Sequence, residues 1–151
     1  EILLNSNYLL AKKLGATGVH LNSKQFDKIK EAKEANLFTI ISCHTFLEIE
    51  KAIEQKADAI TFSPIFNTPN KGEPKGIEKL EEATNLYKDI NIIALGGIVS
   101  EEQISKIENT KLFKVSIGKS SMPKASRMAL AAKAKSLIES TKVPSKSKAK
   151  A

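Results

Sequence analysis

The sequence predicts an α/β fold of the (β/α)8 TIM-barrel type, here an incomplete barrel of about six β/α units. Two observations predict it. Short apolar runs rich in Ile, Val and Phe alternate with amphipathic stretches, and the runs are apolar almost throughout. Strands of a parallel sheet are hydrophobic along their length because helices cover them. We assign residues 1–140 to this partial barrel domain.

The first three units are expected within the first 57 residues. Their strands are the apolar runs 1–5, 17–21 and 37–42, and amphipathic stretches follow each of them over 7–15, 24–35 and 45–57. In these stretches apolar residues recur every three or four positions, which places them on one face of a helix. Each helix can therefore pack on the sheet.

Three more strands follow, at 59–63, 91–96 and 112–117, with helices between them over 76–88 and 100–109. Ser100 is a favourable helix start, since a serine hydroxyl caps free backbone amides. Glu101 and Glu102 then lie at the positive end of the helix dipole. The sequence thus predicts strand–helix alternation along the whole domain.

The order of the units leaves two architectures open: an open doubly wound sheet or part of a barrel. The first strand lacks a following Gly-x-Gly-x-x-Gly motif, which weakens the dinucleotide-binding form of the open sheet. Six units do not close an eight-stranded barrel, which typically takes ~250 residues. We therefore expect a second copy or a partner chain to cover the open sheet edge, unless further strands precede Glu1.

The net charge of +7 belongs to the C-terminal segment. Eight of the 24 Lys and Arg residues follow Pro123, against the single acidic residue Glu139, so the preceding part is neutral overall. The basic tail, 141–151, has little to bury and is expected to be disordered. Its charges lack aromatic neighbours for base stacking, which argues against nucleic acid as a partner. Apolar runs fall short of the ~18 residues of a membrane span, so no membrane partner is expected.

One cysteine and two histidines limit the redox and metal chemistry. Cys43 has no partner for an internal disulfide, which argues for a reducing compartment, so a cytoplasmic location is expected. His20 and His44 lack the spacing of zinc ligands. We expect His20 to be structural, whereas His44 either satisfies a backbone group or belongs to a site. Cys43 is a weak candidate for a nucleophile.

Polar or flexible residues follow every predicted strand, where parallel α/β proteins bind their ligands. In chain order these are Asn5 and Ser6, His20 and Asn22, Ser42 and His44, Thr68 with Asn70 and Lys71, Gly96 and Gly97, and Ser116 with Gly118. The two adjacent glycines suit either backbone amides that approach an anion or a tight turn. Together with the last strand end, they suggest a phosphate-binding loop.

Four segments in this order resemble the thiamine-phosphate synthase and thiazole tautomerase family. They are "NSNYLLAKKLGATGVHL", "ISCH", "ADAITFSPIFNTPNKGEPKGIEKL" and "INIIALGGI", and the similarity covers roughly residues 1–122. The resemblance implies a thiamine-biosynthesis transferase on an eight-fold barrel, of which this chain begins at the third strand. In such synthases hydroxymethylpyrimidine diphosphate is joined to thiazole phosphate, and diphosphate leaves with the help of Mg²⁺.

The resemblance also implies residue roles. The implied catalytic residues are Ser42 and Lys71, both toward diphosphate, with His44 as the base of a tautomerase. The implied substrate- or phosphate-binding residues are Asn5, Thr68, Asn70, Gly96, Gly97, Ser116, Ile117 and Gly118. The expected partners are therefore small phosphorylated thiazole and pyrimidine compounds.

Two positions depart from the synthase pattern. Ser6 and Gln25 stand where synthases carry Mg²⁺-binding aspartates, so no metal ligand is assigned. Pro64 stands where tautomerases carry histidine. Three functions therefore remain open: a synthase that uses Mg²⁺, a tautomerase without a metal, and a non-catalytic homologue that binds a phosphorylated ligand.

Overall fold

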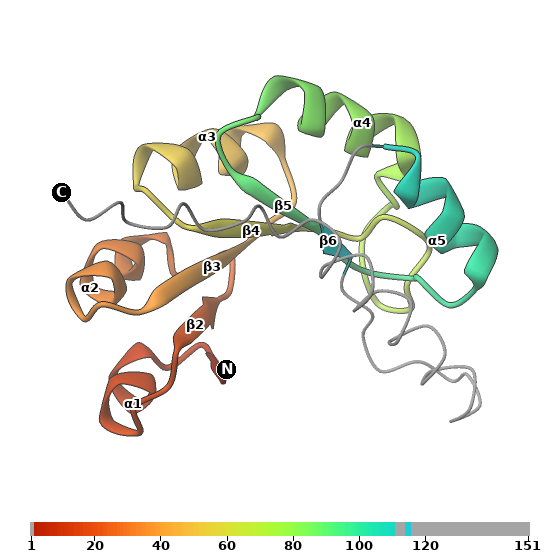
Figure 1. The fold of residues 1–151 in the computed structure, drawn as a ribbon. Helices are drawn as coiled ribbons and strands as arrows, with labels where there is room; N and C mark the ends of the chain where they lie inside the picture. Colours follow the sequence, from red (N-terminus) through yellow and green to blue (C-terminus); the bar gives the residue numbers. More distant parts are fainter. Residues whose placement is uncertain (1, 111–113, 116–151) are drawn as a thin grey trace, which may run out of the picture.

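The computed structural model describes residues 2–110 and 114–115, which form one parallel six-stranded sheet with helices packed on it (Figure 1). The strands are β1 Leu3–Asn5, β2 Gly18–Leu21, β3 Phe38–Cys43, β4 Ala59–Phe62, β5 Asn91–Ala94 and β6 Lys114–Val115. The helices are α1 Tyr8–Lys13, the 3-10 helix η1 Phe26–Lys28, α2 Ile29–Glu34, α3 Phe46–Glu54, α4 Gly76–Leu86 and α5 Glu101–Glu108.

The strand order decides between the two architectures that the sequence leaves open. Neighbours in the sheet follow chain order from β1 to β6, and each pair is parallel. A doubly wound sheet reverses its order at a switch point, whereas barrel strands follow one another in sequence. Figure 1 shows α1 to α5 in an arc around the outside of the strands. Over the described residues β1 and β6 remain edges, so the barrel is not closed.

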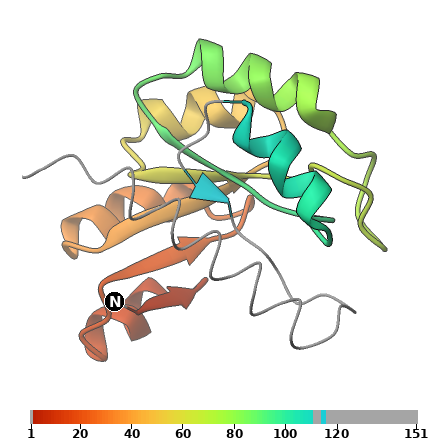
Figure 2. The same ribbon diagram turned by 45° about the vertical axis from the view of Figure 1, so that its right-hand side comes forward.

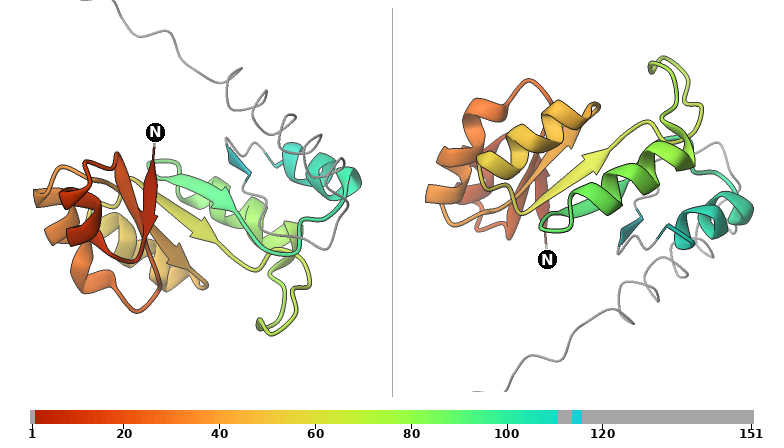
Figure 3. Two further views of the ribbon diagram at one scale, coloured as in Figure 1. Left: turned by 90° about the horizontal axis from the view of Figure 1, so that it is seen from below. Right: turned by 90° about the horizontal axis from the view of Figure 1, so that it is seen from above.

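The sheet twists from one edge to the other. Figures 2 and 3 show successive strands turned relative to one another, so β1 and β5 run at a large angle. Strands of L-amino acids twist in this way, and the helices lie on one face of the twisted sheet. The opposite face, away from the helices, is the face that a barrel turns inward.

The hydrophobic core lies between the sheet and the helices. Alternate strand residues such as Val19, Ile41 and Phe62 point into it, and Ile49 and Leu80 meet them from α3 and α4. Each of these side chains is at most 1% exposed. Burial of one such side chain contributes about 1.5–3 kcal/mol, so this layer is the main source of stability.

Two helix starts show how local sequence sets the element bounds. The Ser100 hydroxyl accepts from the Gln103 backbone amide, and the Gln103 side-chain oxygen accepts from the Ser100 backbone amide. The helix start predicted at Ser100 is therefore confirmed. Thr45 and Glu48 form the same capping box at α3. Each box satisfies amides that have no partner inside the helix.

Several predicted bounds are wrong by a few residues. The strand predicted over 91–96 ends at Ala94, because Gly96 and Gly97 take positive φ angles of 97° and 68° that a strand does not permit. The helix predicted over 24–35 begins only at Phe26, as a 3-10 turn. The predicted boundary at residue 140 and the basic tail lie outside the described residues. Within those residues, no helix is long and apolar enough to span a membrane.

Candidate functional site

A cavity of about 250 Å³ opens at the carboxyl ends of the strands. It is lined by Asn22, Ser23, Ser42, His44, Ser63, Pro64, Thr68, Lys71, Leu95 and Gly96. These residues lie at or shortly after the ends of β2, β3, β4 and β5, which meet at one edge of the sheet because the strands are parallel. Hydroxyls, amides, one histidine and one lysine line the cavity, and none of the described residues brings a carboxylate to it. Such a surface suits an anionic ligand.

The cavity brings together five of the residues predicted from the sequence: Ser42, His44, Thr68, Lys71 and Gly96. The other three predicted residues inside the described range, Asn5, Asn70 and Gly97, do not line it. Asn70 lies on the turn after Thr68 with a positive φ of 60°. The predicted residues Ser116, Ile117 and Gly118 lie outside the described residues.

The loop that carries Thr68 and Lys71 is held against the end of β5. The backbone amides of Ile65 and Phe66 donate to the carbonyls of Leu95 and Gly96, each at 3.0 Å. Further along, the amide of Lys71 donates to the Thr68 carbonyl at 3.1 Å and closes a turn. These bonds fix the backbone on both sides of the cavity and so place the Lys71 side chain at its rim.

Close packing accounts for the two glycines. A Cβ on Gly96 would lie 2.9 Å from Pro64 Cα, and one on Gly97 would lie 2.5 Å from the Asn67 carbonyl oxygen. Real Cβ contacts are almost never so short, and both residues also need positive φ. The glycines are thus required by the neighbouring loop, a reason that differs from the two drawn from the sequence.

His44 has a backbone partner and also lines the cavity. Its Nδ1 lies 2.8 Å from the Ser63 carbonyl oxygen. Because a carbonyl only accepts, Nδ1 carries the proton and Nε2 is the basic nitrogen of the ring. His44 can therefore both satisfy a backbone group and belong to the site. Its Nδ1 anchors the ring on the Ser63 carbonyl, and its Nε2 is left to accept a proton or a hydrogen bond.

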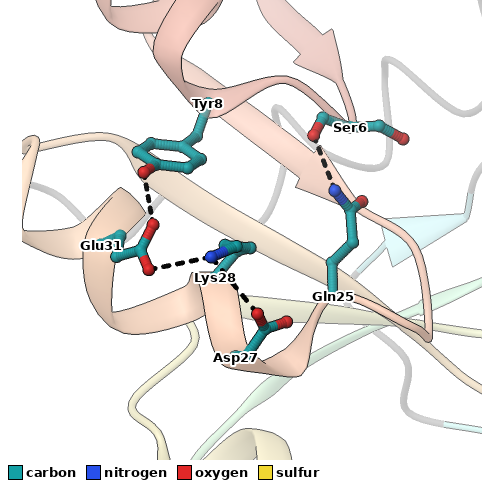
Figure 4. A network of polar contacts seen from close by, with 6 residues as sticks. All are labelled: Ser6, Tyr8, Gln25, Asp27, Lys28 and Glu31. Atoms are coloured by element: carbon teal, nitrogen blue, oxygen red, sulfur yellow. Dashed lines mark hydrogen bonds and ion pairs between the residues drawn. The ribbon is translucent and has the colours of Figure 1, made fainter.

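Ser6 and Gln25, which stand where synthases carry metal-binding aspartates, bond to each other (Figure 4). The Gln25 side-chain amide donates to the Ser6 backbone carbonyl at 2.9 Å, and Gln25 Oε1 accepts from the Asn22 amide at 3.1 Å. Ser6 itself has a positive φ of 62°. A neutral amide therefore joins the loops after β1 and β2.

The two carboxylates drawn in Figure 4, Asp27 and Glu31, are already paired. Lys28 Nζ lies 3.0 Å from Glu31 and 3.3 Å from Asp27, and the Tyr8 hydroxyl also donates to Glu31. The Tyr8 bond, and then Lys28, hold the pKa of Glu31 below its usual value. Over the described residues, no cluster of three His, Cys, Asp or Glu could hold an ion. Mg²⁺ prefers carboxylate oxygens, so this donor set does not fit it.

Cys43 is buried in the core behind the site. Burial, and secondarily the charge of Glu48, raise the pKa of its thiol to about 12. Its Sγ donates to the Glu48 carbonyl at 3.5 Å. A thiol that stays protonated and covered is a poor nucleophile, which argues against a catalytic role.

This burial makes the thiol a probe of unfolding. At pH 8 we expect iodoacetamide to label native Cys43 about a thousandfold more slowly than the urea-unfolded chain, where the thiol regains an ordinary pKa. A raised pKa lowers the thiolate fraction at every pH below it, and burial blocks access as well. Mass spectrometry measures both rates, and equal rates would show that Cys43 is accessible in the folded protein.

Sequence reasoning assigned no role to several lining residues. Asn22 and Ser63 stand at predicted strand ends, and that position is the signal that points to them. Ser23 follows directly and could be found in the same way. Leu95 carries no such signal, because an apolar residue at the end of an apolar run is expected in the core.

The family model described as "Thiamine monophosphate synthase" matches residues 1–120. The thiamine-phosphate synthase of Lysinibacillus sphaericus is 35% identical over 100 residues, which cover 64% of this chain and 47% of that protein. The synthase of Pelagibacter ubique is 34% identical over 106 residues, covering 65% and 49%. The chain thus spans about half the length of these curated relatives.

A solved structure supports the fold. The thiamine phosphate pyrophosphorylase from Pyrococcus furiosus superimposes with a TM-score of 0.75, at 21% sequence identity, over 91% of this chain and 67% of that one. At this identity the likeness concerns the fold. It agrees with a barrel-type α/β architecture.

Proposed function

Because the chain belongs to the thiamine monophosphate synthase family, we propose that it is a thiamine-biosynthesis transferase that joins hydroxymethylpyrimidine diphosphate to thiazole phosphate and releases diphosphate. The observation that carries this proposal is the cavity lined by Lys71 and Ser42, to which the described residues contribute no carboxylate. A departing diphosphate is multiply negative, and cations and hydroxyl donors stabilise it as the bond to carbon breaks.

We assign a different contact with the ligand to each of three residues of the cavity. Among the residues that the structure describes, Lys71 is the one lysine or arginine in the lining, and its ammonium would neutralise the departing diphosphate. The Ser42 hydroxyl, near the end of β3, would donate to the same group. The Thr68 hydroxyl donates to the Phe66 carbonyl at 3.0 Å, which leaves it an acceptor toward the ligand. Since Ser6 and Gln25 offer no carboxylate, we assign no step to Mg²⁺, although synthase activity would imply that ion.

A metal-independent thiazole tautomerase is the second candidate. Two observations favour it: the amide bridge from Gln25 to Ser6, and the basic Nε2 of His44 at the cavity. A neutral imidazole near physiological pH can move a proton between two positions of a thiazole ring. In this reading His44 is the base and Lys71 binds the phosphate of the ligand.

One experiment separates these functions and the non-catalytic alternative. The full chain is incubated with both phosphorylated precursors, with and without Mg²⁺, and separately with a carboxythiazole phosphate, and products are followed by chromatography. Thiamine phosphate formation supports the transferase, and isomerisation that is lost in His44→Gln supports the tautomerase. Calorimetric binding of thiazole phosphate without turnover would indicate a binding protein. Absence of both binding and turnover would refute the proposal.

The cellular setting is part of the same proposal. A biosynthetic role on small phosphorylated compounds suits a cytoplasmic protein, and Cys43 as the single cysteine agrees with a reducing compartment. Within the described residues β1 is an edge strand, so strands that precede Glu1 in a longer protein, a second copy or a partner chain would cover it. Size-exclusion chromatography with light scattering of the full chain measures whether it self-associates.

A further inference from the structure

A polar layer lies on the sheet face opposite the helices. It consists of His20 on β2, Ser42 on β3 and Thr61 on β4, and its side chains alternate with core residues along each strand. Ser42 pairs in register with Thr61, and the ring of His20 reaches across from the neighbouring strand. Ser42 and Thr61 are level in the sheet, and His20, whose register partner is Ile40, reaches them with its ring.

The contacts within this layer centre on Ser42. His20 Nε2 lies 3.0 Å from Ser42 Oγ, and the Thr61 hydroxyl donates to Ser42 Oγ at 3.3 Å. Thr61 Oγ1 is also 3.4 Å from His20 Nε2, and Thr61 is only 4% exposed. Ser42 is the member of the layer that lines the cavity. His20 and Thr61 therefore contact Ser42 from behind the cavity wall.

The protons in this layer decide what Ser42 can offer a ligand. A serine oxygen has one proton and two lone pairs, and Thr61 occupies one lone pair. If His20 Nε2 is unprotonated, it takes the Ser42 proton and the cavity faces only a lone pair, which repels an anion. If Nε2 carries a proton, it donates to the second lone pair of Ser42. The Ser42 proton is then directed into the cavity.

We propose that His20 is a positioning residue whose Nε2–H donates to the Ser42 hydroxyl and so turns the Ser42 proton toward the anionic group of the ligand. This inference rests on the proposed function, because it requires a phosphate or diphosphate at Ser42. Burial lowers the pKa of the His20 imidazole. The donor is therefore a neutral ring in its Nε2–H tautomer, which the bound anion selects.

The tautomer can be measured directly in the wild-type full chain. Protonated and unprotonated imidazole nitrogens have widely separated ¹⁵N shifts, and the chain has only two histidines. Loss of signals in His20→Leu assigns the ring. With inorganic pyrophosphate as the probe, we expect His20 Nε2 to be protonated in the complex. An unprotonated Nε2 in the complex would overturn the proposal.

A double-mutant cycle then tests whether His20 acts through Ser42. By calorimetry with pyrophosphate, Ser42→Ala and His20→Leu are each expected to weaken binding roughly tenfold, as for a hydrogen bond to a charged group. The double variant should bind no worse than Ser42→Ala, since His20 has no target once the hydroxyl is gone. His20→Gln should recover most of the affinity because its amide donates from a similar position. Additive losses would contradict the proposal.

The outcomes separate this inference from the function on which it rests. If the wild-type chain binds no phosphate-bearing probe, the proposed function and the inference both fail. If Ser42→Ala weakens binding while the cycle is additive, the proposed site stands and the role of His20 fails. A His20 that only supports the fold would lower the melting temperature and leave the cycle additive, so thermal unfolding is recorded for each variant.

Discussion

Replacing Gly97 with alanine is expected to lower the free energy of unfolding by about 2–5 kcal/mol. A non-glycine residue at its φ of 68° costs roughly 1–2 kcal/mol. The added Cβ would also lie 2.5 Å from the Asn67 carbonyl oxygen and 2.6 Å from the Phe66 carbonyl carbon. These are backbone atoms that cannot rotate away, and relief of such overpacking typically costs 1–3 kcal/mol more. Urea unfolding measures the change as a lower midpoint.

Gly15 provides the matched control. It has almost the same φ, 65°, but an added Cβ would meet no atom within 4 Å. Gly15→Ala should therefore show only the backbone cost, roughly 1–2 kcal/mol. Equal losses for the two variants would mean that the loop after β4 does not press against Gly97. Because that loop carries Lys71, Gly97→Ala should also weaken phosphate binding.

Replacing Lys71 with methionine is expected to weaken binding of a diphosphate probe roughly tenfold or more. Within the described part of the chain Lys71 is the one lysine or arginine that lines the cavity, and an ammonium contributes both charge and hydrogen-bond donors to a phosphate group. Its side chain is exposed, so water and salt screen the attraction, and the loss should shrink as ionic strength rises. Calorimetric titration with pyrophosphate at two salt concentrations measures both effects.

Lys75→Met is the control for charge alone. Lys75 belongs to the same loop, and its backbone amide donates to the Pro64 carbonyl at 2.8 Å, a bond that the substitution keeps. Its side chain does not line the cavity. It should therefore lose little affinity. If Lys75→Met weakened binding as much as Lys71→Met, general electrostatic attraction would explain the effect and the assigned site would be wrong. Both variants should unfold at the wild-type temperature.

Much of the fold was predictable because its signals are local. The alternation of apolar and polar residues follows the geometry of strands and helices, so all five helices and the six strands of the described residues were expected near their observed places. Ser100 illustrates this, because a cap needs only residues within one turn. The end of β5 illustrates the limit. Leu95 looks like strand, and only the loop packed against Gly96 and Gly97 ends it there.

The site was partly predictable for the same reason. In a parallel sheet all strand ends lie at one edge, so polar residues at those ends, such as Ser42 and Lys71, are expected to gather there. The spacing in the sequence could not place Asn5 or Asn70, which lie away from the cavity lining. The position of a residue in a loop depends on how the loop folds back, and several long-range backbone bonds decide that.

The sequence by itself determined the α/β alternation, the polar strand ends, the loss of carboxylates at Ser6 and Gln25, and the family resemblance. Only the tertiary structure decided the sequential order of the sheet, the cause of the two glycines, and the contact of His20 with Ser42. The physical reason is the separation along the chain between the residues that interact. Periodicity tells which face a side chain takes, whereas its neighbour on that face comes from another strand, brought there by packing across the core.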